Sequence, residues 1–167
     1  MKNLTFEEAI AYTEALLSRS DLDDSQLESE IATLIKTANG ARGFFVCFLT
    51  GEWGDIPSSG VIKALQSVPT AIAELLVKNL AMSTAMTITH QRAENIEQAK
   101  GSDRVAKRTA FLINQVDLAE VREIALQMQQ SANTNAGEYL SFFKKWNYDA
   151  EQKQAIANVL AQTLAHV

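Results

Sequence analysis

The chain has little of the three residue types that most often interrupt or cross-link a fold. Its 167 residues include one cysteine, two prolines and seven glycines. The single Cys47 excludes an internal disulfide, and its apolar surroundings in the sequence are typical of a thiol packed as a small hydrophobic group in a reducing compartment. The scarcity of proline and glycine argues against long loops and disorder. We therefore expect one ordered cytoplasmic domain, residues 1–167.

Positive charge is also scarce, because the formal net charge is −5. Residues 1–60 contain ten acids and four bases, a net charge of −6, whereas residues 61–167 contain ten acids and eleven bases, a net charge of +1. A nucleic-acid-binding protein normally has a basic face. The densest basic cluster here is Arg104, Lys107 and Arg108, which Asp103 dilutes. We expect no nucleic-acid partner.

Two segments are candidates for a targeting or membrane element. Glu7, Glu8 and Glu14 interrupt the first residues, where a secretory signal needs an apolar core. The longest apolar stretch, Pro69 to His90, carries Glu74 and Lys78 near its middle, and charges are costly in hydrocarbon. We therefore expect a soluble protein with no membrane partner, in which Pro69 to His90 is a buried core helix.

Helix signals recur at almost every polar break in the chain. Capping-box patterns begin at Thr5, Ser25 and Asp149. The apolar run Phe44 to Thr50 has strand-like residues, but the sequence offers no second convincing strand to pair with it, so a short buried helix is favoured. The sequence predicts an all-α, single-domain helical bundle of about eight or nine helices around the central helix Pro69 to His90.

Several boundaries of these helices are predicted from single residues. The helix that begins at Ser25 is expected to stop at Asn39-Gly40, and Pro69 suits the first turn of the central helix. No stop signal follows His90 before Lys100-Gly101, so that helix is expected to continue through Ile96, and the next is expected to begin at Ser102. Residues 131–137 are predicted to form a loop.

No familiar catalytic, metal or cofactor motif is present. The sequence lacks a nucleophile elbow and a glycine-rich phosphate loop. His90, Glu94 and Glu97 would share one face of a continuous helix, but one imidazole and two carboxylates are too few to specify a metal. A single helix running straight to His90 also fits a haem pocket poorly. We expect no metal and no cofactor.

The stretch Arg42 to Asp55 is a candidate wall of a ligand pocket. Trp53 stands between Gly51 and Gly54 and between two acids, and an indole there could supply a flat face at a pocket mouth. The alternative is that Trp53 covers the core and Arg42 pairs with a nearby acid. The polar end of the central helix adds His90 and Arg92. The candidate ligand-binding residues are Arg42, Trp53, His90 and Arg92.

A short aromatic helix, Glu138 to Trp146, is the candidate interface. Its aromatic residues cover more than one narrow stripe, and Tyr and Trp are favoured at binding hot spots. Tyr139, Phe143 and Trp146 are therefore the candidate interface residues. The alternative is that these aromatic residues, together with Phe142, all belong to the core.

Together these patterns favour a cytoplasmic helical binding or assembly module that acts through contacts with a protein partner or a second copy of the chain. They favour a protein without catalytic activity. The alternative is an enzyme or small-ligand binder with a pocket between the central helix and the Arg42 to Asp55 stretch, which requires Arg42, Trp53 and His90 to converge.

Overall fold

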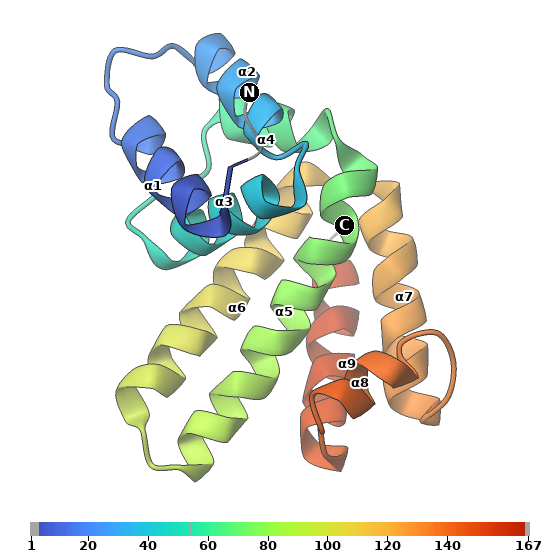
Figure 1. Ribbon diagram of the computed structural model, residues 1–167. Helices are drawn as coiled ribbons and strands as arrows, with labels where there is room; N and C mark the ends of the chain where they lie inside the picture. The colour runs from blue at the N-terminus through green and yellow to red at the C-terminus, as the bar shows by residue number, and fades with distance from the viewer. Residues whose placement is uncertain (1–3, 54, 166–167) are drawn as a thin grey trace. The chain divides into compact units, whose positions relative to one another are not determined.

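The computed structural model describes residues 4–53 and 55–165, and within them all regular secondary structure is α-helical. The predicted all-α class is confirmed, as is the predicted number of helices, since nine are assigned in the described residues (Figure 1). They are α1 (Phe6–Leu17), α2 (Asp24–Leu34), α3 (Ala38–Thr50), α4 (Ser59–Gln66), α5 (Pro69–Arg92), α6 (Ile96–Val116), α7 (Ala119–Thr134), α8 (Leu140–Lys145) and α9 (Ala150–Leu164).

The chain divides into two compact units, the first ending at Leu75 and the second beginning at Leu76. The boundary falls inside α5, so the first unit contains α1 to α4 and the start of α5. The second contains the rest of α5 and the helices after it. The expectation of a single domain stays a prediction, and the two units are described in turn.

In the first unit, α1 packs against α3. The capping box of Thr5 and Glu8 opens α1 as predicted, and Ala9, Thr13 and Leu16 form its buried side. Gly43 of α3 lies directly on this side, because a Cβ added at Gly43 would be only 2.6 Å from the Cβ of Ala9. The absent side chain at position 43 is what lets the two helices approach closely.

The apolar run before Gly51 is helical and buried, as the sequence favoured. The rings of Phe44 and Phe48 stack with centroids 5.3 Å apart, and Phe45 meets Phe44 edge to face at 5.4 Å. The predicted stop at Asn39-Gly40 was wrong, since both residues lie inside α3. The reason is that the side chain of Thr37 accepts a hydrogen bond from the backbone N–H of Gly40 and so begins a new helix.

The second helix, α2, packs against α4. Its capping box starts at Asp23, two residues before the predicted Ser25, and its partner is Gln26. Asp24 then accepts a hydrogen bond from Ser59 at the start of α4, and Gly60 lies against the backbone of Asp24. These contacts join the beginnings of the two helices.

In the second unit, α5 and α6 form a hairpin through a three-residue turn (Figure 1). The predicted continuation of α5 through Ile96 was wrong. Glu94 has a left-handed backbone, with φ of 56°, and the side chain of Asn95 accepts a hydrogen bond from Gln98 to begin α6. Consequently Lys100, Gly101 and Ser102 lie inside α6 rather than at a helix boundary.

Elsewhere in the second unit, α9 contacts α6 and α7, and α7 also contacts α8. The predicted loop at 131–137 was partly wrong, because α7 continues to Thr134 and Asn135 ends it in a left-handed conformation. Ser131 is buried in α7, and its hydroxyl accepts a hydrogen bond of 3.1 Å from the backbone N–H of Tyr139. That bond fixes the connection between α7 and α8.

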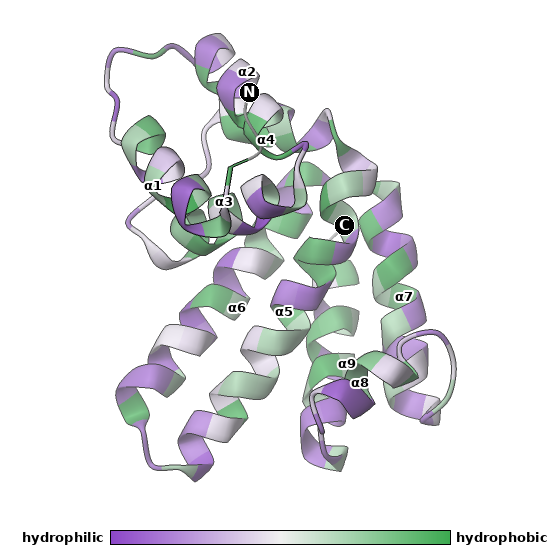
Figure 2. Ribbon diagram, viewed as in Figure 1, coloured by the Kyte–Doolittle hydropathy of each residue, from purple (hydrophilic) through white to green (hydrophobic). Residues whose placement is uncertain are grey.

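The apolar residues of α5 form a continuous buried stripe, which in the second unit comprises Leu76, Val77, Leu80, Ala81 and Ala85. Figure 2 shows hydrophilic residues gathered at the end of α5 where it turns into α6. Within the described part of the chain, α5 is the one helix long and apolar enough to cross a membrane by length and composition, and 39% of its most apolar window is buried. The role of a soluble core helix stays a prediction.

Two helical glycines give a matched test of this packing. Gly43→Ala is expected to destabilise the fold by about 1–3 kcal/mol, because its methyl group would overlap Ala9. Gly101→Ala is the control: apart from its own helix backbone and chain neighbours, nothing lies within 4 Å of a Cβ added there, so it should stabilise the chain by roughly 0.5–1 kcal/mol. Urea unfolding followed by circular dichroism measures both. Equal effects of the two substitutions would contradict a close contact at Gly43.

Candidate functional site

Two of the predicted ligand-binding residues, Arg42 and Trp53, belong to the first unit. Arg42 is exposed on α3, with its guanidinium carbon 4.9 Å from the centroid of the Phe6 ring. Trp53 is half-buried and lies over Gly51, where an added Cβ would be 2.7 Å from the indole ring. The indole lines a cavity of 390 Å³ together with Glu52 and Asp55. Gly54, the second predicted flanking glycine, lies outside the described residues.

The other two predicted ligand-binding residues, His90 and Arg92, belong to the last turn of α5 in the second unit. His90 is partly buried, and its carbonyl oxygen accepts a hydrogen bond from the N–H of Asn95 at 2.9 Å. The expected shared face of His90, Glu94 and Glu97 is not formed, because Glu94 lies in the turn and Glu97 lies on α6. Residues 4–53 and 55–165 contain no group of three His, Cys, Asp or Glu residues placed to hold a metal ion. The convergence of His90 with Arg42 and Trp53 stays a prediction.

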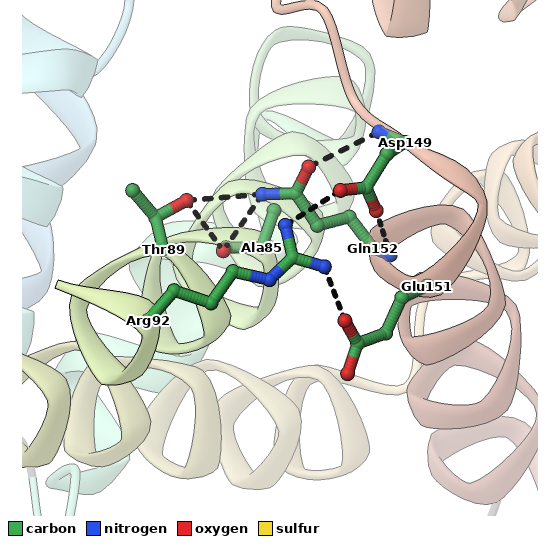
Figure 3. Close-up of polar contacts among 6 residues, drawn as sticks. All are labelled: Ala85, Thr89, Arg92, Asp149, Glu151 and Gln152. Atoms are coloured by element: carbon green, nitrogen blue, oxygen red, sulfur yellow. Dashed lines mark hydrogen bonds and ion pairs between the residues drawn. The ribbon is translucent and has the colours of Figure 1, made fainter.

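Arg92 joins the end of α5 to the beginning of α9 (Figure 3). Its guanidinium donates to the carboxylate of Asp149 at 2.5 Å and also to that of Glu151. The hydrogen bond from Arg92 holds the pKa of the Asp149 carboxyl below its ordinary value, and the N–H of Gln152 acts in the same direction. All three side chains are about half exposed or more, so this pairing contributes modestly to stability. Arg92 is therefore engaged within the protein.

Gln152 makes the buried part of the same junction. Its amide nitrogen donates to the carbonyl oxygen of Ala85 at 3.2 Å and to the hydroxyl of Thr89 at 3.0 Å. Its amide oxygen accepts from the N–H of Asp149 at 3.1 Å, which completes the predicted capping box of α9 (Figure 3). One side chain thus starts α9 and attaches it to α5.

The three predicted interface residues lie in different environments. Tyr139 is 7% exposed and Phe143 is 2% exposed, so both side chains belong to the core of the second unit. Trp146 is 45% exposed, and the Nζ atom of Lys145 lies 5.6 Å from its ring centroid. The predicted interface stays a prediction, and it now depends on Trp146.

Cys47 is buried in α3. Burial raises the pKa of its thiol, and the negative charge of Glu14 acts in the same direction. The thiolate is the reactive form of cysteine, so this environment disfavours a nucleophilic role.

A larger cavity, here called the α5–α6–α9 pocket, lies between three helices of the second unit and has a volume of 480 Å³. Its walls combine small, apolar and polar side chains. They are Thr84, Thr87 and Ile88 of α5, Asp103, Ala106, Lys107, Ala110 and Asn114 of α6, and Ala155, Val159, Gln162 and Thr163 of α9. Alanine and threonine leave space where three helices meet, whereas larger side chains would fill it.

The polar side chains of the pocket differ in whether they have a hydrogen-bond or ion-pair partner within the protein. The hydroxyls of Thr84 and Thr163 donate to carbonyl oxygens one turn earlier on their own helices, at 2.8 Å and 2.7 Å. Lys107 pairs with Asp103 at 2.7 Å on the exposed side of α6. The side-chain oxygen of Asn114 is buried but has no hydrogen-bond partner. It is the one buried side-chain polar atom in the described residues for which none is found.

The sequence did not predict this pocket, because the candidate sites were chosen for reactive, charged or aromatic residues in known patterns. The pattern that marks it is a recurrence of small and aliphatic residues at helical spacing. Ala106 and Ala110 are four residues apart on α6, as are Ala155 and Val159 on α9, and Thr84 and Ile88 on α5.

The basic cluster of the sequence, Arg104, Lys107 and Arg108, does not form one exposed basic surface on α6. Arg108 is 6% exposed, whereas Arg104 and Lys107 are exposed.

The substitution Gln152→Ala tests the junction that positions α9. It should destabilise the protein by about 2–3 kcal/mol, because it removes the capping amide and leaves the carbonyl of Ala85 without its donor from α9. Thermal unfolding of the variant measures the change. The control is Gln154→Ala on the exposed side of α9, which loses one hydrogen bond to Asn158 and should change stability by less than about 0.5 kcal/mol. Similar losses in both variants would contradict a special role for Gln152.

Comparison with known proteins gives a family. No curated protein and no solved structure matches the chain. A family model described as "Uncharacterised conserved protein UCP020893" matches residues 5–163, which include every residue of the α5–α6–α9 pocket. The chain therefore belongs to this family of conserved proteins.

Proposed function

We propose that this protein is a binding protein and that the α5–α6–α9 pocket holds a small organic ligand. The observation that carries the proposal is the pocket itself, whose 480 Å³ lies within the range of roughly 300–1,000 Å³ found for small-molecule sites. Such sites are mainly apolar and contain a few placed polar groups. Ile88, Val159 and the alanines supply the apolar wall here, and Asn114 and the threonines supply the polar groups.

The pocket has room for an elongated ligand. A second cavity of 280 Å³ shares Thr87 and Asp103 with it and continues toward the α5–α6 turn, where it reaches Gln91 and Ile96. Ile96 is 56% exposed, so the outer cavity offers apolar surface to a ligand that extends beyond the first. Asp103, which pairs with Lys107, lines both cavities.

The side chains of the pocket are suited to orienting a ligand. The threonine hydroxyls donate to carbonyl oxygens of their own helices, so these hydroxyl groups hold fixed positions. Fixed hydrogen-bonding groups in an apolar cleft provide specificity. This is the behaviour expected of a binding protein without catalytic activity, and the buried thiol of Cys47 suits the reducing cytoplasm, where we propose that it acts.

Filling the pocket tests this proposal. A fragment library is titrated into isotopically labelled protein, and two-dimensional amide spectra are recorded. Bound fragments are expected to perturb the amides of pocket residues such as Thr87, Ala110 and Val159. Ala155→Trp, which places an indole in the pocket, should abolish these shifts, whereas Ala161→Trp on the exposed side of the same helix should keep them. Shifts that persist in Ala155→Trp, or that lie elsewhere, would contradict the proposal.

A second candidate function is contact with a protein partner or with another copy of the chain. The observation in its favour is Trp146, a 45% exposed indole beside Lys144 and Lys145. Exposed Trp residues with nearby cationic groups are frequent anchors of protein interfaces. Phe143 and Tyr139, which are buried, would then belong to the core of the second unit and not to the contact surface.

The oligomeric form of this proposal is tested at Trp146. Light scattering of the purified chain is expected to give a mass above that of the monomer, and Trp146→Glu should lower it by placing a charge in the contact. Trp146→Phe keeps an aromatic ring and should retain most of the association. A wild-type mass equal to that of the monomer at all concentrations would contradict self-association.

A further inference from the structure

We infer that the cavity lined by Trp53 in the first unit binds an organic cation, a protonated amine carried by a small apolar body. This cavity of 390 Å³, here called the Trp53 cavity, shares no lining residue with the α5–α6–α9 pocket, so the inference does not rest on the proposed function. Each of the helices α1, α2, α3 and α4 contributes one apolar side chain to its wall. These side chains are Leu17, Leu27, Phe48 and Val61.

The interior of the Trp53 cavity suits the apolar body of such a ligand. Ile56 and the half-buried indole of Trp53 complete the hydrophobic part of the wall. Small-molecule sites have volumes of roughly 300–1,000 Å³ and are lined mainly by hydrophobic and aromatic side chains, with a few polar groups that set specificity. An apolar group that enters this cavity leaves water, which favours binding without regard to the charge of the ligand.

The charged side chains of the cavity determine which charge the ligand carries. They are Glu52 and Asp55, and the described lining residues include no Lys, Arg or His. Both acids are exposed, so they lie where the cavity meets solvent. Asp55 already takes part in an interaction within the protein, whereas Glu52 forms no ion pair in the part of the chain that the structure describes. The carboxylate of Glu52 is therefore the group that pairs with the ammonium of the ligand.

Trp53 supplies a second contact with the same charge. The π-system of an indole attracts a cation placed over its face, and the indole of Trp53 lines the same cavity as Glu52. Because the carboxylate is exposed, the ammonium keeps part of its hydration and avoids the high cost of burying a charge without partners. An anion would instead meet two carboxylates, and a neutral molecule would gain neither contact.

Three probes with alkyl chains of equal length isolate the charge. They are hexylamine, which is protonated near neutral pH as a lysine amine is, 1-hexanol and hexanoate. Each is titrated into the isotopically labelled full chain, and its affinity is read from the indole N–H of Trp53 and the amides of Leu27 and Val61. Hexylammonium is expected to bind about three- to thirtyfold more tightly than hexanol, because it adds an exposed ion pair and a cation–π contact. Hexanoate should bind more weakly than hexanol.

A matched pair of variants locates the recognition. Glu52→Gln removes the charge with little change in size and should weaken hexylammonium binding about two- to fivefold, with hexanol binding unchanged. The control is Glu7→Gln, because Glu7 is exposed on α1 of the same unit and does not line the cavity. It changes the net charge equally and should leave both affinities unchanged. The thermal midpoint of Glu52→Gln should equal that of the wild type, so its weaker binding does not reflect unfolding.

The contribution of the ring is measured separately. Trp53→Leu keeps an apolar wall and should reduce the preference for hexylammonium over hexanol about two- to fivefold, read from the amides of Leu27 and Val61. An unchanged preference in this variant would remove the indole from the inference.

Other results would overturn the inference as a whole. Affinities of hexylammonium and hexanol within twofold of each other would show that the cavity does not recognise charge. Equal losses in Glu52→Gln and Glu7→Gln would show that only the net charge of the chain attracts the probe, and no loss in either would remove Glu52 as the partner. If millimolar hexylammonium shifts no amide of the first unit, the cavity does not bind it. None of these outcomes affects the α5–α6–α9 pocket, whose test is read from amides of the second unit.

Discussion

The hydrogen bonds of one buried amide, that of Gln152, determine where α9 lies on α5. Its nitrogen reaches the carbonyl of Ala85 and the hydroxyl of Thr89, and its oxygen caps the helix on which it stands. The α5 residues of the pocket lie within a turn of these acceptors, and Ala155 lies one turn after Gln152. The position of the pocket wall is therefore a consequence of satisfying this amide away from water, where an unpaired polar group is costly.

In the same unit, the side-chain oxygen of Asn114 is buried without a hydrogen-bond partner. The amide of Gln152 uses both its oxygen and its nitrogen within the protein, whereas the buried oxygen of Asn114 has no partner. An oxygen in that condition lowers stability, because it has lost its hydrogen bonds to water and has gained none within the protein. The family match spans both amides.

Much of the fold could be predicted from the sequence, because its signals are local. The capping boxes at Thr5 and Asp149 satisfy backbone groups within one turn, and the proline at the start of α5 has no N–H that needs a partner. The errors came where the local signal is ambiguous. Asn39-Gly40 resembles a helix end, but Thr37 caps a new helix across it. The turn after α5 requires a left-handed Glu94, a conformation that the residue type does not suggest.

The candidate site was harder to predict, because the side chains that line the pocket form no catalytic or ligand-binding motif in the sequence. Arg92 illustrates the difficulty from the other direction: its charge suggested a ligand, yet it pairs with Asp149 and Glu151, which are close only after α9 has packed on α5. Burial of Tyr139 and Phe143 likewise depends on contacts between helices. Composition identifies groups able to bind, but only packing decides which of them are already engaged.

The unsatisfied oxygen of Asn114 has a cost in stability. Leaving such a group buried costs the protein about 1–3 kcal/mol, which an apolar side chain of the same size would avoid. Burial of the neighbouring Leu112 and Ile113 on the same helix offsets this cost, because each fully buried aliphatic side chain contributes roughly 1.5–3 kcal/mol. The fold of the second unit therefore tolerates one unpaired polar atom on α6, whereas the amide of Gln152, which joins two helices, has both its oxygen and its nitrogen paired.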